Sequence, residues 1–335
     1  MAEEKKGESS IFAVSSKDGH FRRAESAFRS TISRAPGADF PPEPNRYVLY
    51  VVYSCPWAHR ANIVRSLKGL ESLIQLVVLD PRLTADGWKF TGEYGSATED
   101  PLYGFRYLRD LYLKADPGYQ GRYTVPVLWD TKRETIVSNE SSEIIRMLAL
   151  EFDDLVAPGL REENRPGGGI YPERLRTEID DLNGWVYDRI NNGVYKAGFA
   201  STQEAYDANV YPLFEALDRV EQILADGRKF LLGEHLTEAD VRLYPTIVRF
   251  DVAYHHSFKC NLKMIRHDYP SIHRWLRMLY WDESDLTNHG AFRKTTFFDT
   301  YKLGYQQAAV RKLGYDGEIV VPAGPVPHIL PLDEN

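Results

Sequence analysis

The chain of 335 residues carries a formal net charge of −7, with 43% hydrophobic and 27% charged residues. This composition is ordinary for a soluble globular protein, and the length suits two domains. The acidic balance and the lack of a dense Lys/Arg run argue against nucleic acid as a partner. No stretch approaches the roughly 20 apolar residues that a membrane helix needs, so we expect no membrane partner.

The cysteines and the first residues indicate the compartment. Two cysteines in 335 residues form no disulfide framework and fit a reducing environment. The sequence begins Met-Ala-Glu-Glu-Lys-Lys-Gly, without the apolar segment of a secretory signal, so we expect a cytoplasmic protein. Cys260 has no neighbours typical of a reactive thiol and is predicted to be structural. His255 and His256 lack Cys, Asp or Glu at ligand spacing, so we expect no metal.

Strand and helix signals alternate after a polar, extended N-terminal segment over residues 1–45. Residues 46–157 are predicted to form an α/β domain in the order β-α-β-α-β-β-α. This order indicates a three-layer sandwich around a mixed sheet. The predicted strands are residues 48–53, 74–79, 125–129 and 135–137, and the predicted helices are residues 57–70, 102–114 and 141–150.

Strand signals almost vanish beyond a Pro- and Gly-rich stretch over residues 158–170, which we interpret as a linker. Residues 171–312 are predicted to form an all-α domain. Thr237 and Asp240 have the spacing of a capping box, with Asp in place of the usual Glu or Gln. A proline-rich tail over residues 313–335 is predicted to be extended. The predicted helices of the second domain are residues 173–190, 203–225, 238–252 and 272–280.

Cys55 is the strongest candidate for a catalytic residue. It follows an apolar, β-branched run and precedes Pro56, which is favoured at the first position of a helix. Cys55 is therefore predicted to be the N-cap, where the helix dipole favours a thiolate and lowers the pKa of the thiol. His59 and Arg60 are expected to add positive charge. Because Ala58 stands where a CxxC site has its second cysteine, an external thiol must resolve this site.

Two further features point to the ligand of this thiol. Val125 precedes Pro126 and is therefore extended, which leaves a backbone edge able to pair with an extended peptide. Glu140 and Ser141 stand at the start of a predicted helix. A helix N-terminus binds carboxylates, and Glu140 can take an ammonium group. One thiol, one peptide-binding edge and one amino-acid site together describe a glutathione pocket.

Several longer runs resemble the Xi class of cytosolic glutathione transferases, the glutathionyl-hydroquinone reductases. The resemblance extends from about residue 20 to about residue 300. It implies a thioredoxin-like first domain with a cis Val-Pro bond, a helical-bundle second domain and a homodimer. The runs are Cys55-Pro-Trp-Ala-His-Arg60, Leu67-Lys-Gly-Leu-Glu71, Tyr112-Leu-Lys-Ala-Asp-Pro117, Thr124-Val-Pro-Val-Leu-Trp-Asp130, Asn139-Glu-Ser-Ser-Glu-Ile-Ile-Arg-Met147 and Asn191-Asn-Gly-Val-Tyr-Lys-Ala-Gly-Phe199.

The resemblance also implies a reaction, with glutathione as co-substrate. The Cys55 thiolate attacks the sulfur of a glutathionyl-hydroquinone, hydroquinone leaves, and a second glutathione resolves the mixed disulfide. Tyr195 and Tyr305 match the tyrosines of the acceptor pocket, whose hydroxyls can bond to the ring oxygens. The glutathione-binding positions that carry over are Trp88, Arg122, Val125, Glu140 and Ser141.

The sequence departs from the class near its end. The class usually continues with a Tyr-Tyr-x-Ser-His pattern, where this chain has Leu303-Gly-Tyr-Gln-Gln-Ala-Ala309. An altered acceptor pocket, and with it an altered substrate, is therefore expected around Tyr305. Two alternatives stay open. One is an Omega-type thiol transferase or dehydroascorbate reductase, and the other is a non-catalytic relative that binds hydrophobic or aromatic ligands.

Overall fold

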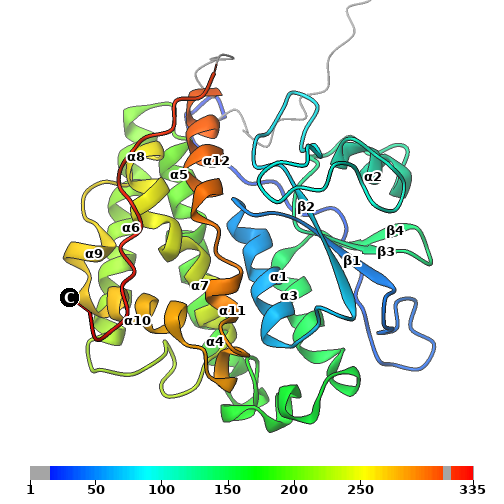
Figure 1. The fold of residues 1–335 in the computed structure, drawn as a ribbon. Helices are drawn as coiled ribbons and strands as arrows, with labels where there is room; N and C mark the ends of the chain where they lie inside the picture. Colours follow the sequence, from blue (N-terminus) through cyan, green and yellow to red (C-terminus); the bar gives the residue numbers. More distant parts are fainter. Residues whose placement is uncertain (1–15, 312–317, 335) are drawn as a thin grey trace, which may run out of the picture.

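The computed structural model describes residues 16–311 and 318–334. An α/β part and a helical part lie side by side, as the sequence predicted (Figure 1). The α/β part is built on one four-stranded sheet in the order β2-β1-β3-β4. Its strands are β1 (Tyr47–Val52), β2 (Ile74–Leu79), β3 (Val127–Asp130) and β4 (Thr135–Ser138).

The central strand β1 sets the register of the sheet. It runs parallel to β2, with Tyr47 opposite Ile74, and antiparallel to β3, with Tyr50 opposite Val127. Strands β3 and β4 are antiparallel, so the sheet is mixed as predicted. Every residue of β1 is buried, which is why its sequence is a continuous apolar run rather than an alternating one.

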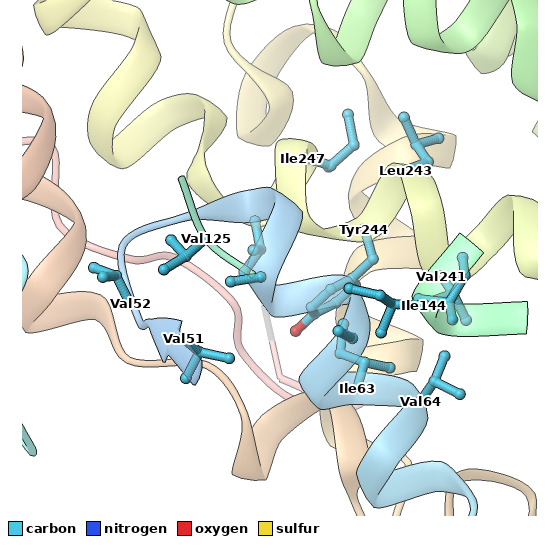
Figure 2. Packing of buried hydrophobic residues seen from close by; sticks show 14 of the residues in the cluster. Val51, Val52, Ile63, Val64, Val125, Ile144, Val241, Leu243, Tyr244 and Ile247 are labelled. Atoms are coloured by element: carbon cyan, nitrogen blue, oxygen red, sulfur yellow. The ribbon is translucent and has the colours of Figure 1, made fainter. Parts of the chain in front are cut away.

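Three helices cover the sheet. Helices α1 (Pro56–Leu67) and α3 (Ser141–Leu150) lie on the face toward the helical part, and α2 (Leu108–Ala115) lies on the opposite face (Figure 1). Figure 2 shows Ile63 of α1 packed near Tyr244 of the helical part. Because α1 is buried on both sides, it forms the wall shared by the two parts.

Two predicted elements of the α/β part begin later in the structure than the sequence predicted. Strand β3 begins at Val127 rather than residue 125, because Pro126 has no N–H to donate to a neighbouring strand. The predicted helix over residues 102–114 begins only at Leu108. Before it, the Asp100 carboxylate accepts a hydrogen bond from the N–H of Tyr103 at 2.7 Å and holds a turn.

The helical part contains the predicted helices, but two of them end in π-helical turns, Tyr187–Asn191 and Phe250–Tyr254. The last helix, Phe298–Arg311, was not predicted, because it lacks a clear apolar stripe. No helix in the described ranges is long and apolar enough to cross a membrane. The helices are α4 (Arg176–Val186), α5 (Gly193–Gly198), α6 (Gln203–Leu224), α7 (Glu238–Arg249), α8 (His255–Ser257), α9 (Ile265–Asp268), α10 (Pro270–Trp281), α11 (Ala291–Lys294) and α12 (Phe298–Arg311).

Three segments lie between or beside the two parts. Residues 158–170 form short 3₁₀ turns, and Glu162 from this stretch binds the fully buried Lys68 at 3.1 Å. The described part of the N-terminal segment, residues 16–45, has no helix or strand and pairs with the sheet at the bridge of Arg29 with Ser138, whereas the prediction for residues 1–15 lies outside the described residues. Residues 318–334 have no helix or strand, as predicted for the tail; the prediction for residues 313–317 lies outside the described residues.

The capping box of α7 is confirmed, and its aspartate has a wider role. The Asp240 side chain is fully buried and accepts from the N–H of Thr237 at 3.0 Å. It also accepts from the N–H of Leu231 at 3.0 Å and from Nε1 of Trp275 at 3.0 Å. One carboxylate thus joins α7, α10 and the preceding loop.

We expect Asp240→Ala to lower the free energy of unfolding by about 3 kcal/mol, because it leaves several buried donors without an acceptor. Urea denaturation followed by circular dichroism measures the change. Asp226→Ala is the control, since Asp226 pairs with Arg228 at the surface. Equal midpoints for the two variants would contradict the role given to Asp240.

Candidate active site

Two adjoining cavities lie between the two parts and the N-terminal segment. The smaller, of about 120 Å³, is mostly apolar and contains the Cys55 side chain. The larger, of about 570 Å³, is polar and reaches the N-terminus of α3. Both are lined by the same five residues where they meet, Arg23, Trp57, Arg122, Thr124 and Val125.

Cys55 stands at the predicted place, in the turn between β1 and α1. It is the N-cap of α1, with extended backbone angles, and Pro56 is the first helical residue. Its Sγ donates a long hydrogen bond to the carbonyl oxygen of Val125 at 3.6 Å. The thiol therefore touches the residue before the cis proline, which lines both cavities.

The electrostatics of the thiol differ from the prediction of a lowered pKa. Burial raises the pKa of Cys55 above its ordinary value. The N–H groups of Ala58 and Trp57 oppose that rise, as expected at a helix N-terminus, and so do Arg249 and Arg23. In the ligand-free protein the effect of burial is larger than the effect of these positive groups.

The prediction that His59 and Arg60 supply this positive charge was wrong. Burial, together with Arg249, holds the pKa of His59 far below its usual value, so the ring is neutral. Its Nδ1 accepts from Arg249 at 2.9 Å, and its Nε2 donates to Thr295 at 3.0 Å. The Arg60 guanidinium instead binds in the helical part, where it donates to Oδ1 of Asn191 at 2.9 Å. The cations that act on Cys55 come instead from distant parts of the chain.

Glu140 and Ser141 lie at the N-terminus of α3 and line the larger cavity. Glu140 caps the helix by accepting from the N–H of Ser142 at 3.0 Å and accepts from Ser26 at 3.0 Å. Burial alone would raise the pKa of Glu140, but these hydrogen bonds and Arg60 hold it below its ordinary value. An ionised carboxylate therefore caps the first turn of α3 at the edge of the larger cavity.

Val125, Arg122 and Trp88 surround the opening toward Cys55. Val125 is followed by a cis peptide bond, as the resemblance implied. Burial and the nearby Arg23 lower the pKa of Arg122, whose guanidinium forms no ion pair within the described residues. Trp88 lines the smaller cavity, and its Nε1 has no partner in the described part of the chain.

Tyr195 and Tyr305 line the smaller cavity on the side of the helical part. Their hydroxyl oxygens are 2.9 Å apart, and Oη of Tyr305 is also 2.9 Å from Oη of Tyr254. Burial raises the pKa of Tyr195 to about 12, so its hydroxyl is protonated at neutral pH. Gly304 allows α12 to approach this closely, because an added Cβ would lie 2.9 Å from the Ser54 side chain.

The structure thus brings all eight predicted side chains to the two cavities, and it adds three that sequence reasoning missed. Arg23 lies between the cavities, with its guanidinium 4.7 Å from the ring centres of both Trp57 and Tyr195. Tyr254 belongs to a π-helical turn, and Arg249 ends the helix before that turn. No local pattern marks these residues, since each is brought to the site only by chain folding.

Protein-family models match both parts of the chain, and a named relative matches most of its length. A model of the glutathione S-transferase N-terminal domain matches residues 54–151, and one of the C-terminal domain matches residues 203–277. The "glutathione S-transferase omega-like 2" of Schizosaccharomyces pombe is 51% identical over 318 residues, which are 94% of this chain and 96% of the relative.

Two further similar proteins have solved structures, and one of them is also similar in a comparison of sequences. The Escherichia coli "glutathionyl-hydroquinone reductase YqjG" is 50% identical over 275 residues, covering 80% of this chain and 81% of its own. Its glutathione-bound structure aligns with a TM-score of 0.81, at 43% identity, over 94% of this chain and 97% of that chain. The Xi glutathione S-transferase of Phanerochaete chrysosporium aligns with a TM-score of 0.85, at 49% identity, over 95% of this chain and 97% of its own.

The surroundings of the two cysteines predict selective labelling. Cys55 opens into a cavity, whereas Cys260 is fully buried and burial strongly raises its pKa. We expect iodoacetamide to label Cys55 at least about 100 times faster than Cys260 in the native protein. Peptide mass spectrometry measures both rates. Cys55→Ser should remain almost unlabelled until it is unfolded, and rapid labelling of Cys260 would contradict the structure.

Proposed function

The chain belongs to the glutathione transferase family, in its Xi class, and from this membership we propose that it is a glutathionyl-hydroquinone reductase. It removes glutathione from S-glutathionyl-hydroquinones. The observation that carries the proposal is the position of Cys55, a thiol that lines the apolar cavity and contacts Val125, a residue shared with the polar cavity. A polar and an apolar cavity that adjoin beside one sulfur suit a substrate with a peptide half and an aromatic half.

The first step forms a mixed disulfide. The Cys55 thiolate attacks the sulfur that joins glutathione to the ring, and a sulfur–sulfur bond forms. The carbon–sulfur bond breaks, its electron pair stays on the ring carbon, and that carbon takes a proton, so free hydroquinone leaves. The ring is reduced and the two sulfurs are oxidised together.

The second step restores the thiol. A second glutathione, as its thiolate, attacks the glutathionyl sulfur of the mixed disulfide and leaves as oxidised glutathione, while Cys55 departs as a thiolate. Position 58 is Ala, and the other cysteine, Cys260, is buried away from the cavities. An external thiol is therefore required, and glutathione supplies it.

The polar cavity offers groups for each end of glutathione. Glu140 is suited to the ammonium group of the γ-glutamyl end, and Ser141 with the N-terminus of α3 is suited to its carboxylate. The backbone of Val125 pairs with the cysteinyl residue in the manner of an added strand. Arg122 is suited to the glycyl carboxylate, and Trp88 packs on the peptide.

The apolar cavity suits the aromatic half of the substrate. Tyr195 and Tyr305 present protonated hydroxyls on the side of the helical part, where they can donate to the ring oxygens. A donated hydrogen bond stabilises negative charge that develops on the ring as the carbon–sulfur bond breaks. We place both tyrosines, with Tyr254 behind them, in the acceptor pocket.

Assembly and location follow from the family rather than from the geometry. We propose a cytoplasmic homodimer, because the Xi class forms dimers and two cysteines suit a reducing compartment. Glutathione is the co-substrate, and the chemistry above uses no metal.

A second candidate function is a thiol transferase or dehydroascorbate reductase of the Omega type. The name of the S. pombe relative, "omega-like", is the observation that favours it. Both functions use the same thiol, so the choice of acceptor separates them. Turnover of a glutathionyl-hydroquinone and of dehydroascorbate by one enzyme preparation compares the two directly.

We expect Cys55→Ser to lower the turnover of glutathionyl-hydroquinone by at least about 1000-fold, because a hydroxyl cannot form the mixed disulfide. Chromatography of free hydroquinone measures turnover. Mass spectrometry of the wild type, with the second glutathione withheld, should find one glutathione on Cys55. Equal turnover by the two proteins would overturn the mechanism and favour a non-catalytic, ligand-binding role.

We expect Glu140→Gln to weaken glutathione binding about tenfold, because the amide still caps α3 but has lost its charge. Calorimetry in a Cys55→Ser background measures the dissociation constant without disulfide formation. The control is Glu143→Gln on the same helix, which should change affinity by less than about twofold, since Glu143 pairs with Arg29 at the surface. Similar affinities for both variants would remove Glu140 from the site.

A further inference from the structure

Arg249 is a fully buried arginine at the end of α7, and its guanidinium faces the turn that carries Cys55. It donates to the backbone oxygen of Ser54 at 3.1 Å and of Tyr53 at 2.9 Å. It also donates to the oxygen of Pro245 at 2.8 Å and to Nδ1 of the neutral His59 at 2.9 Å. One side chain from the helical part thus holds the two residues that precede the thiol.

All of these acceptors are neutral, and Arg249 forms no ion pair with a carboxylate of the described residues. Two other buried cations do have one: Arg46 binds Asp130 at 3.0 Å, and Lys68 binds Glu162 at 3.1 Å. The buried Arg60, like Arg249, has none within the described residues and donates to the amide oxygen of Asn191. Since a buried charge without an opposite charge is costly, an anion that forms beside Arg249 is stabilised by it.

The groups near Arg249 that can carry a negative charge are the phenols of Tyr254, Tyr301 and Tyr305 and the thiol of Cys55. Burial raises the pKa of each of the three phenols, so they remain neutral at physiological pH. A thiol ionises more readily than a phenol. Cys55 is therefore the group that can become the anion beside Arg249.

We propose that Arg249 is the positioning residue of Cys55: it holds the Tyr53–Ser54 backbone and serves as the counter-cation of the Cys55 thiolate. The inference rests on the proposed function only for the catalytic use of that thiolate. The charge of Arg249 stays in place throughout the cycle. It stabilises the thiolate both before attack and when Cys55 leaves the mixed disulfide.

Arg249 acts alongside other groups at the same site. The effect of Arg249 on the thiol can be measured separately from theirs. Arg249 lies on α7 and contacts the turn before Cys55, whereas Arg23 and Arg122 line the cavities. The titratable and charged groups around Cys55 are Arg23 of the N-terminal segment, His59 of α1, Arg122 of the loop before β3, Tyr195 of α5, Arg249 of α7, Tyr254 of the following turn and Tyr305 of α12.

The test is the pH dependence of iodoacetamide alkylation of Cys55, which needs no glutathione. Arg249→Gln keeps donors for the carbonyls but removes the charge. We expect its alkylation midpoint to rise by about one pKa unit, so that the rate at pH 7 falls about tenfold. Arg249→Lys keeps the charge and should hold the midpoint near that of the wild type. An unchanged midpoint in Arg249→Gln overturns the proposal.

The matched control is Arg165→Lys. Arg165 is also buried and also binds α1, but at its other end, where it donates to the oxygen of Leu67 at 3.0 Å. This variant should lose stability without any change in the alkylation midpoint. A similar midpoint shift in Arg165→Lys would mean that loosening α1, rather than the charge, alters the thiol, and would overturn the counter-cation role.

A second pair of variants applies if Arg249→Gln fails to fold. Cys55→Asp and Cys55→Asn both introduce good N-caps, but only the aspartate variant supplies a permanent anion at pH 7. We expect the unfolding constant of Cys55→Asp at pH 7 to be at least about tenfold lower than that of Cys55→Asn, a larger difference than the roughly two- to fivefold typical of a charge at an exposed helix N-terminus. Because pairing lowers the pKa of the introduced carboxyl group in the folded state, this advantage should disappear as the pH falls below about 4. Equal stability at pH 7 overturns the proposal.

The alkylation result is independent of the substrate. If the wild type does not turn over glutathionyl-hydroquinone but Arg249→Gln still raises the midpoint, the proposed function fails and the role of Arg249 stands. If the wild type turns over glutathionyl-hydroquinone but the alkylation midpoint of Arg249→Gln is unchanged, the role given to Arg249 is wrong and the proposed function stands.

Discussion

The position of the Cys55 thiol depends on how α1 is held between the two parts of the molecule. Its first turn is tied to α7 through Arg249, which binds the backbone oxygens of Tyr53 and Ser54. Its last turn is tied to the helical side through Arg165 and Asn288, which bind the oxygens of Leu67 and Ser66. Helix α1 therefore belongs to both parts, and the thiol cannot move relative to the helical wall of its pocket without breaking buried hydrogen bonds.

The two cavities of the site belong mostly to different parts of the molecule. The polar cavity, with Glu140 at the N-terminus of α3, belongs mostly to the α/β part. The apolar cavity, with Tyr195 and Tyr305 on one side, is closed by the helical part. Cys55 lines the apolar cavity beside Val125, which both cavities share, and this placement suits the proposed substrate, whose sulfur joins a peptide half to an aromatic half.

Much of the fold was predictable because its signals are local. The continuous apolar run of β1 and the Cys-Pro pair at the start of α1 depend on neighbouring residues. The capping box at Thr237 depends on a spacing of three residues. Helix α12 was missed because it packs around Gly304 and Tyr305 without a clear apolar stripe. The late start of α2 was missed because a turn around Asp100 competes with the helix.

The sequence by itself pointed to Cys55 as the candidate thiol, to its place at a helix N-terminus, to the extended residue before Pro126 and to Glu140 at the start of α3. Each follows from residues adjacent in the chain. Only the tertiary structure decided which charges act on the thiol. His59 and Arg60, its neighbours in sequence, are directed elsewhere, while Arg249 and Arg23 face it from distant segments. The reason is physical: the pKa of a buried group depends on burial and on charges nearby in space, which are set by chain folding rather than by position in the sequence.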